Sequence, residues 1–227
     1  MTVDVRARFD EVDERVRAAA KRAGRSVPIE VVAVSKTFPV DVILAAVEAG
    51  VTVLGESRAQ ELKEKYAVVG DSAMWHFIGH LQTNKVRNVV GPARLIHSID
   101  RFGVAEAVGR RAHSLGITQD VLIEINVARD PNKHGADPAQ AVALALEVAA
   151  IDGVRVVGAM GMAPFLEDPA DTRPYFAELR GLSEALVREL PTATELSMGM
   201  TRDFEVAVEE GATIVRVGEA IFGPRPR

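Results

Sequence analysis

The sequence predicts a single (β/α)8 barrel of the TIM type with an extra helix at its N-terminus. Short apolar segments alternate with amphipathic ones along the chain, a pattern typical of βαβ units around a parallel sheet. The length of 227 residues lies near the lower end of the range for such a barrel, roughly 200 residues upward. No Pro-, Gly- or Ser-rich linker divides the chain. We therefore expect residues 1–227 to form one domain.

The predicted elements begin with a helix. Apolar residues recur at helical spacing from Val5 to Ala23, and the pattern stops at Gly24. Eight short apolar segments follow, with the length and composition of buried strands. These strands are expected at Glu30–Ser35, Thr52–Gly55, Met74–Gly79, Arg94–Ile99, Val121–Val127, Val154–Met160, Glu195–Met198 and Thr213–Val217.

Seven amphipathic segments between the strands predict helices. They cover Val40–Ala49, Ser57–Tyr66, Thr83–Val90, Arg101–Leu115, Pro138–Ile151, Arg173–Leu190 and Arg202–Glu210. Asp137 followed by Pro138 marks one helix start, because aspartate caps a helix and proline suits its first position. Glycines suited to a left-handed cap follow four helices: Gly50, Gly116, Gly153 and Gly211.

A doubly wound open sheet is the alternative fold. That fold usually carries Gly-x-Gly-x-x-Gly after its first strand. Here the first strand is followed by Lys36-Thr37-Phe38-Pro39, so we favour the closed barrel.

Composition excludes several functional classes. The net charge is −5, which argues against a nucleic-acid binder. The absence of cysteine excludes disulfides and thiolate metal sites. The five histidines are scattered, and we predict no metal site from them. No segment approaches the roughly 18 apolar residues of a membrane span, and the N-terminus is charged. We expect a cytoplasmic protein without membrane contact.

Lys36 is the strongest candidate for chemistry. It follows the buried apolar run that ends at Ser35, at the carboxyl end of the first strand, which is the working face of a barrel. Desolvation there can lower the pKa of an amine and make it a nucleophile. The alternative is a lysine whose stem lies on the rim while its ammonium stays in water.

The loops after strands seven and eight predict a phosphate site. They contain Ser197, Gly199, Gly218 and Glu219, and a short helix is expected from Glu219. Barrels commonly bind phosphate with these two loops and such a helix. Two ordinary turns are the alternative. A phosphate site facing a reactive lysine suits pyridoxal phosphate, which also needs a partner for its pyridine nitrogen. Arg216 can be that partner, and it would keep the nitrogen unprotonated.

With these residues, the chain resembles the pyridoxal phosphate homeostasis proteins, a family related to the N-terminal barrel of bacterial alanine racemases. The resemblance covers nearly the whole length. It is carried by Val34-Ser35-Lys36-Thr37, Gly55-Glu56 with Gln60-Glu61, Trp75 to Lys85, Lys133-His134-Gly135, Leu196 to Met200, Val215 to Gly218 and Ile221-Phe222-Gly223.

The resemblance implies a carrier of pyridoxal 5'-phosphate, bound as a Schiff base on Lys36. It implies phosphate contacts from Ser197, Gly199, Gly218 and the residue at 219, and a pyridine contact from Arg216. The family commonly has threonine or serine where this chain has Glu219. We therefore expect only the backbone N–H of Glu219 to contact the phosphate, with its side chain in solvent. Ser57, where the family commonly has asparagine, is left unassigned.

The resemblance also implies a role in vitamin B6 homeostasis without an assigned catalytic reaction. Apo forms of pyridoxal phosphate enzymes are possible recipients, and a monomer is expected because the racemases' second domain is missing. The only tyrosines, Tyr66 and Tyr175, fall in predicted helices, so the second base of a racemase is lacking. Two alternatives stay open: a pyridoxal phosphate enzyme, such as a weak racemase or lyase acting on a small amino acid, and a cofactor-free Schiff-base aldolase acting on a sugar phosphate.

Overall fold

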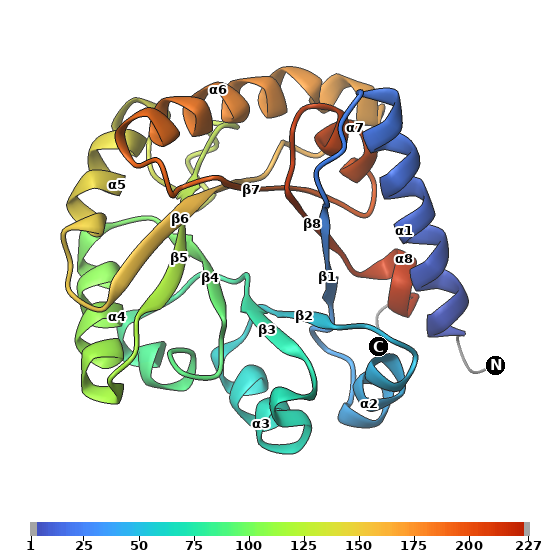
Figure 1. The fold of residues 1–227 in the computed structure, drawn as a ribbon, viewed down its shortest axis with the longest axis horizontal. Coiled ribbons are helices and arrows are strands. Elements are labelled where there is room, and N and C mark those ends of the chain that lie inside the picture. The colour runs from blue at the N-terminus through green and yellow to red at the C-terminus, as the bar shows by residue number, and fades with distance from the viewer. Residues whose placement is uncertain (1–3, 225–227) are drawn as a thin grey trace.

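A computed structural model describes residues 4–224 and shows eight parallel strands that close into a barrel in sequence order (Figure 1). The strands are β1 (Glu30–Val34), β2 (Val53–Glu56), β3 (Met74–Phe77), β4 (Leu95–Ile99), β5 (Gln119–Ile125), β6 (Val154–Gly161), β7 (Glu195–Met200) and β8 (Ile214–Val217). Strand β1 pairs with both β2 and β8, since Ala33 lies opposite Leu54 on one side and Val217 on the other. The predicted (β/α)8 barrel is confirmed.

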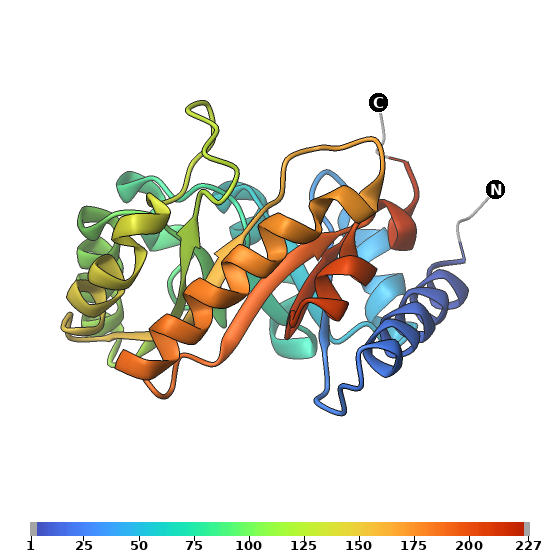
Figure 2. The same ribbon diagram turned by 90° about the horizontal axis from the view of Figure 1, so that it is seen from above.

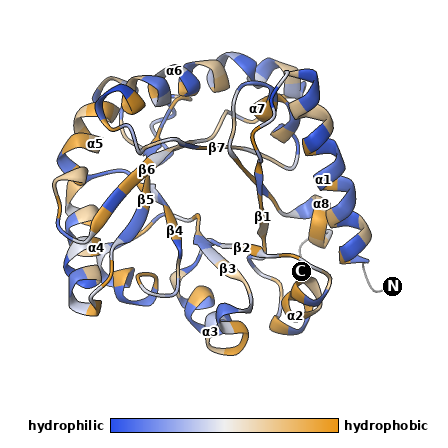
Figure 3. Ribbon diagram, viewed as in Figure 1, coloured by the Kyte–Doolittle hydropathy of each residue, from blue (hydrophilic) through white to orange (hydrophobic). Residues whose placement is uncertain are grey.

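Helices surround the barrel. They are α1 (Val5–Arg22), α2 (Val40–Glu48), α3 (Ala59–Val69), α4 (Phe102–Leu115), α5 (Ala141–Ala149), α6 (Arg173–Glu189), α7 (Phe204–Glu209) and α8 (Glu219–Phe222). Figure 3 shows hydrophobic and hydrophilic residues mixed along them, as expected for helices with one face against the sheet. No helix within residues 4–224 is long and apolar enough to cross a membrane.

The extra N-terminal helix is also confirmed. Helix α1 lies beside α7 and α8, so the first and last helices of the chain are neighbours (Figures 1 and 2). Two ion pairs join α1 to α7: Arg15 with Glu205, and Arg22 with Glu209. The helix thus covers the barrel near the seam where β8 meets β1.

The helix expected at Thr83–Val90 is the one clear error in the element prediction. The segment forms a 3₁₀ helix, η2 (Thr83–Asn88). A 3₁₀ helix has three residues per turn and places residues i and i+3 on one side. Val86 and Val89 have this spacing, and both are buried. Val86, within η2, and Val89, directly after it, thus both pack on the core in a short connection.

The predicted cap signals are confirmed, since Asp137 caps a helical turn and the four cap glycines, Gly50, Gly116, Gly153 and Gly211, all have positive φ. The Asp137 carboxylate accepts a hydrogen bond from the Ala139 N–H at 2.8 Å, and Pro138 opens a short 3₁₀ turn, η3 (Pro138–Gln140), which leads into α5. Gly116 has φ of 67° directly after α4, in the left-handed conformation that a C-terminal cap requires.

The barrel interior contains an apolar layer and a polar layer. Side chains from six strands form the apolar cluster: Val32, Val53, Leu95, Leu122, Met160 and Ile214. Alternate residues of a strand share a face, so residues two positions further along also point inward. Three of these are buried polar groups, His97, Glu124 and Arg216. The polar layer therefore lies toward the carboxyl ends of the strands.

Candidate functional site

A cavity of about 350 Å³ opens at the carboxyl end of the barrel. Four of the six predicted site residues line it: Lys36, Arg216, Gly218 and Glu219. Residues 162–166, in the loop after β6, and residues 200–203, at and just after the end of β7, line it as well. The cavity thus joins the ends of strands that are distant in sequence but adjacent in the barrel.

Lys36 lies in a tight turn that begins directly after β1. The Phe38 N–H donates to the Ser35 carbonyl at 3.2 Å and closes the turn. Thr37 has φ of 70°, a conformation that is uncommon for a residue other than glycine. Its N–H donates to the Glu61 carboxylate at 2.9 Å. Helix α3 therefore holds the backbone on one side of Lys36.

A buried lysine fixes the other side of this turn. Lys65 Nζ, on α3, donates to the Ser35 carbonyl at 2.9 Å, to Glu56 Oε1 at 2.6 Å and to Glu61 Oε2 at 3.1 Å. The Ser35 hydroxyl donates to the same Glu56 oxygen at 2.7 Å. Burial raises the pKa of the Glu56 carboxyl, and Lys65 opposes that shift. The network ties the ends of β1 and β2 to α3 beneath Lys36.

Arg216 lines the cavity and is almost fully buried. Its guanidinium donates to Ser197 Oγ at 2.5 Å and to the Gly161 carbonyl at 3.2 Å. Burial lowers its pKa to about 10, while Glu124 and Asp203 act in the opposite direction. This pKa leaves the guanidinium charged at neutral pH. Arg216 therefore presents a fixed cation to the cavity.

A chain of hydrogen bonds runs from Arg216 into the barrel. Ser197 Oγ lies 3.0 Å from His97 Nδ1, and His97 Nε2 lies 3.1 Å from His76 Nδ1. Burial lowers the pKa of His76 to about 3 and that of His97 well below its ordinary value. Both rings are therefore neutral. Because arginine only donates, the Ser197 hydroxyl accepts from Arg216 and can donate to His97 Nδ1, which leaves His97 Nε2–H to donate to His76.

Comparison with known proteins identifies the family. The family model for the alanine racemase N-terminal domain matches residues 8–226. A pyridoxal phosphate homeostasis protein of Aquifex aeolicus is 46% identical over 221 residues, which cover 96% of this chain and 97% of that protein. This chain belongs to the pyridoxal phosphate homeostasis protein family.

Solved structures agree with that family. The structure of PipY from Synechococcus elongatus PCC7942 with pyridoxal phosphate bound is 35% identical, with a TM-score of 0.80, and the match covers 93% of this chain and all of PipY. The alanine racemase of Corynebacterium glutamicum is 16% identical with a TM-score of 0.70, and the match covers 96% of this chain but 62% of the racemase. The second likeness shows a shared fold alone.

In this family member, two of the predicted phosphate contacts, Ser197 and Gly199, are not among the described residues that line the cavity, although each adjoins one that does. The Ser197 hydroxyl is fully buried beside Arg216 and His97. Gly199 has φ of 89°, and a Cβ added there would lie 2.5 Å from the Ala207 Cβ. Gly199 therefore allows β7 to pack closely on α7. Contacts from Ser197 and Gly199 to a phosphate stay predictions.

Gly218 and Glu219 lie at the cavity as the sequence predicts. The Gly218 N–H donates to the Thr201 hydroxyl at 3.3 Å, and Thr201 also lines the cavity. Glu219 is exposed, in agreement with a side chain directed to solvent. Ser57, which the sequence left unassigned, and Lys133, from the Lys133-His134-Gly135 motif, line the cavity too.

Sequence reasoning missed three residues that organise the site: His97, Glu124 and Lys65. His97 and Glu124 lie in strands that are buried on both faces, so alternation of polar and apolar residues could not show which face points inward. Lys65 lies in an amphipathic helix, where a lysine is ordinarily solvated. The one available signal was the pairing of Lys65 with Glu61, four residues earlier on the same helix.

Proposed function

We propose that this chain binds pyridoxal 5'-phosphate in the cavity at the carboxyl end of the barrel and serves in vitamin B6 homeostasis as a carrier rather than as an enzyme. The observation that carries the proposal is the convergence of Lys36 and Arg216, from neighbouring strands β1 and β8, on one cavity. The relatives' name and the PipY complex supply the identity of the ligand.

The residues of the cavity fit this cofactor. A volume of about 350 Å³ is that of a small-ligand pocket. Lys36 is the group that would hold the cofactor covalently through its aldehyde carbon. The Thr201 hydroxyl accepts from the Gly218 N–H and keeps its own O–H, which a phosphate could accept from. An added Cβ at Gly218 would lie 3.3 Å from the Val34 carbonyl, so this close passage of the backbone favours glycine.

Arg216 supports a holding role rather than catalysis. When bound, the cofactor supplies a reactive aldehyde and a pyridine ring that withdraws electrons most strongly once its nitrogen is protonated. A charged guanidinium beside that nitrogen opposes its protonation. The neutral histidines and Ser197 hold the guanidinium in place. Arg216 would therefore help to bind the cofactor while weakening the electron withdrawal by its pyridine ring that catalysis requires.

The tyrosines of the chain also support a carrier. Tyr66, near the end of α3, donates a hydrogen bond to Asp71, and Tyr175, on α6, packs against the main hydrophobic core. The residues described as lining the cavity include neither. A racemase needs a second proton carrier on the opposite face of its substrate, and these tyrosines are placed elsewhere.

The proposal is tested by loading the purified chain with pyridoxal phosphate and recording visible absorbance. We expect a bound chromophore in the wild type and in the Lys63→Ala control, which removes an exposed lysine of α3, and none in Lys36→Ala. Exchange of the α-proton of amino acids in deuterated water tests the enzyme alternative. Prompt exchange that depends on Lys36 would contradict a carrier.

The finer parts of the role concern partners, assembly and location. We propose a cytoplasmic monomer that gives its cofactor to apo forms of pyridoxal phosphate enzymes. Separating the loaded chain from an apo-enzyme by a dialysis membrane tests whether transfer requires contact. Analytical ultracentrifugation tests the monomer, and a sedimenting dimer would contradict it.

A further inference from the structure

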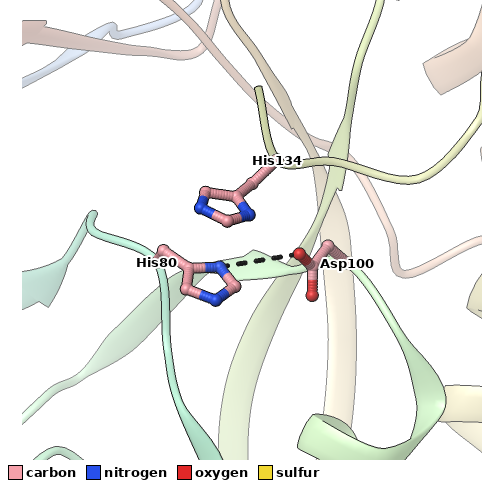
Figure 4. A group of neighbouring side chains, drawn as sticks. All are labelled: His80, Asp100 and His134. Carbon is pink, nitrogen blue, oxygen red and sulfur yellow. Dashed lines mark ion pairs between the residues drawn. The ribbon is translucent and has the colours of Figure 1, made fainter. Parts of the chain in front are cut away.

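Three side chains outside the hydrogen-bonded chain of Arg216 meet at the carboxyl end of the barrel (Figure 4). They are His80, which follows β3, Asp100, which follows β4, and His134, in the segment after β5. One donor atom from each lies within 4.8 Å of the other two. We refer to these residues as the His80 cluster. Because β3, β4 and β5 are consecutive neighbours in the barrel, the fold itself brings the three together.

We propose that the His80 cluster binds a divalent transition-metal ion, with Zn²⁺ as the ion to test. Two imidazoles and one carboxylate form a donor set that zinc commonly uses. Three protein ligands leave at least one coordination position for water or an anion. The proposal is independent of the cofactor, since none of the three residues is among those assigned to it.

The distances within the cluster suit a shared ion better than a hydrogen bond. His80 Nδ1 and Asp100 Oδ2 are 3.6 Å apart, too far for an N–H···O bond. Zinc bonds of about 2.1 Å at tetrahedral angles place two ligand atoms roughly 3.4 Å apart. The observed separation is close to that value.

His80 Nδ1 is a buried polar atom without a hydrogen-bond partner among the described residues. Buried polar atoms are ordinarily satisfied, so an unpaired one calls for a missing partner. The Asp100 carboxylate is oriented by Arg101, whose guanidinium donates to Asp100 Oδ1 at 2.7 Å. The other oxygen, Oδ2, is the one that lies near His80. Asp100 Oδ2 is thus held toward the histidines.

The two rings are stacked, with centroids 3.6 Å apart and planes 12° from parallel. An imidazole nitrogen binds a metal in the plane of its ring, and the planes of two stacked rings do not meet at a common point. One of the two rings must therefore turn for both to bind a single ion. His134 is exposed and can turn without disturbing the core. Lys133, next to it, lines the cofactor cavity, which places the ion at the edge of that cavity.

The other histidines provide the contrast. His76 and His97 are buried inside the barrel. His113, on α4, is exposed, and its Nδ1 lies 2.7 Å from Asp152 Oδ2; within residues 4–224 no third metal-ligating group joins this pair. His113→Ala is therefore a matched control, because it also removes one surface histidine beside an aspartate.

The test is a titration of the full chain, free of purification tag and pyridoxal phosphate, with ZnCl₂ in a calorimeter and with Co²⁺ followed by visible absorbance. We expect one equivalent bound, tetrahedral cobalt bands, and affinity at least about tenfold weaker in His134→Ser and Asp100→Asn. His113→Ala should bind as the wild type does. Circular dichroism should show that His134→Ser folds, since the residue is exposed. Absence of binding in the wild type, or equal affinity in His134→Ser, would overturn the proposal.

Discussion

Arg216 Nη1 donates to Ser197 Oγ at 2.5 Å, and the same hydroxyl lies 3.0 Å from His97 Nδ1. One serine therefore links the cation of the cavity to the neutral histidines inside the barrel. The sequence indicated Ser197 as a phosphate contact, and the structure adds a second role for it. The Ser197 link thus helps to determine where the guanidinium lies at the cavity.

Ser197→Ala should destabilise the fold. The change leaves a buried, charged nitrogen of Arg216 without its acceptor, which costs about 1.5–3 kcal/mol. Urea unfolding of the cofactor-free chain measures this loss. Ser114→Ala is the control: Ser114 is exposed, and we expect a change below about 0.5 kcal/mol. Equal stability of Ser197→Ala and wild type would show that the hydroxyl does not hold Arg216.

Lys65→Met should be more damaging, because it removes the one cation of a buried network. The Glu56 carboxylate, fully buried, would lose its ion pair, at a cost of about 3–5 kcal/mol. Denaturant unfolding measures the loss, and Lys63→Met is the control on the exposed side of the same helix.

A double variant separates the charge from the packing around Lys65. Glu56→Gln combined with Lys65→Met removes the unpaired charge and should recover part of the lost stability, since a neutral side chain is less costly to bury. If Lys65→Met alone were as stable as the wild type, the turn that holds Lys36 would not depend on α3.

Gly199→Ala should destabilise the end of β7. Alanine is strained at a φ of 89°, and its Cβ would lie 2.5 Å from the Ala207 Cβ. Overpacking of this kind costs about 1–3 kcal/mol. Gly181→Ala is the control in the opposite direction. Gly181 lies inside α6 with nothing within 4 Å of an added Cβ, so alanine should stabilise by about 0.5–1 kcal/mol. Thermal unfolding of both variants checks the contrast.

Glu124→Gln should change how stability depends on pH. Burial raises the pKa of Glu124 from 4.5 to about 7. The folded chain therefore holds this proton more tightly than the unfolded chain, and its contribution to stability, complete below about pH 4.5, is lost as pH rises through about 7. Glutamine cannot ionise. The variant should match the wild type at the acid end and exceed it above neutrality by up to about 3 kcal/mol.

The measurement for Glu124→Gln is the difference in free energy of unfolding between variant and wild type across that pH range. His76 and His97 contribute in the opposite direction, because burial lowers their pKa values. Both histidines are present in the two proteins, so their contributions cancel in the difference. A difference that is constant with pH would show that Glu124 has an ordinary pKa.

The sequence was sufficient for the barrel and for the residues that end its strands. Alternating apolar and amphipathic segments indicate the fold class, and the buried apolar run before Lys36 places that lysine at the carboxyl end of a strand. The sequence could not predict which side chains of a fully buried strand point into the barrel, because a strand buried on both faces shows no alternation of polar and apolar residues. Lys65 and Ser197 depend on partners from distant segments, and such tertiary contacts leave no periodic signal. The sequence predicts an α-helix where the 3₁₀ helix η2 forms, because residues three apart, such as Val86 and Val89, share a face in both kinds of helix.

The covalent link at Lys36 is the central claim, and trapping it is the most direct test. The chain loaded with pyridoxal phosphate is reduced with borohydride, digested and examined by mass spectrometry. We predict one pyridoxyl modification, on the peptide that contains Lys36, in both the wild type and Lys63→Ala. Modification of another lysine at equal yield, or an unmodified Lys36 in a loaded chain, would contradict the account.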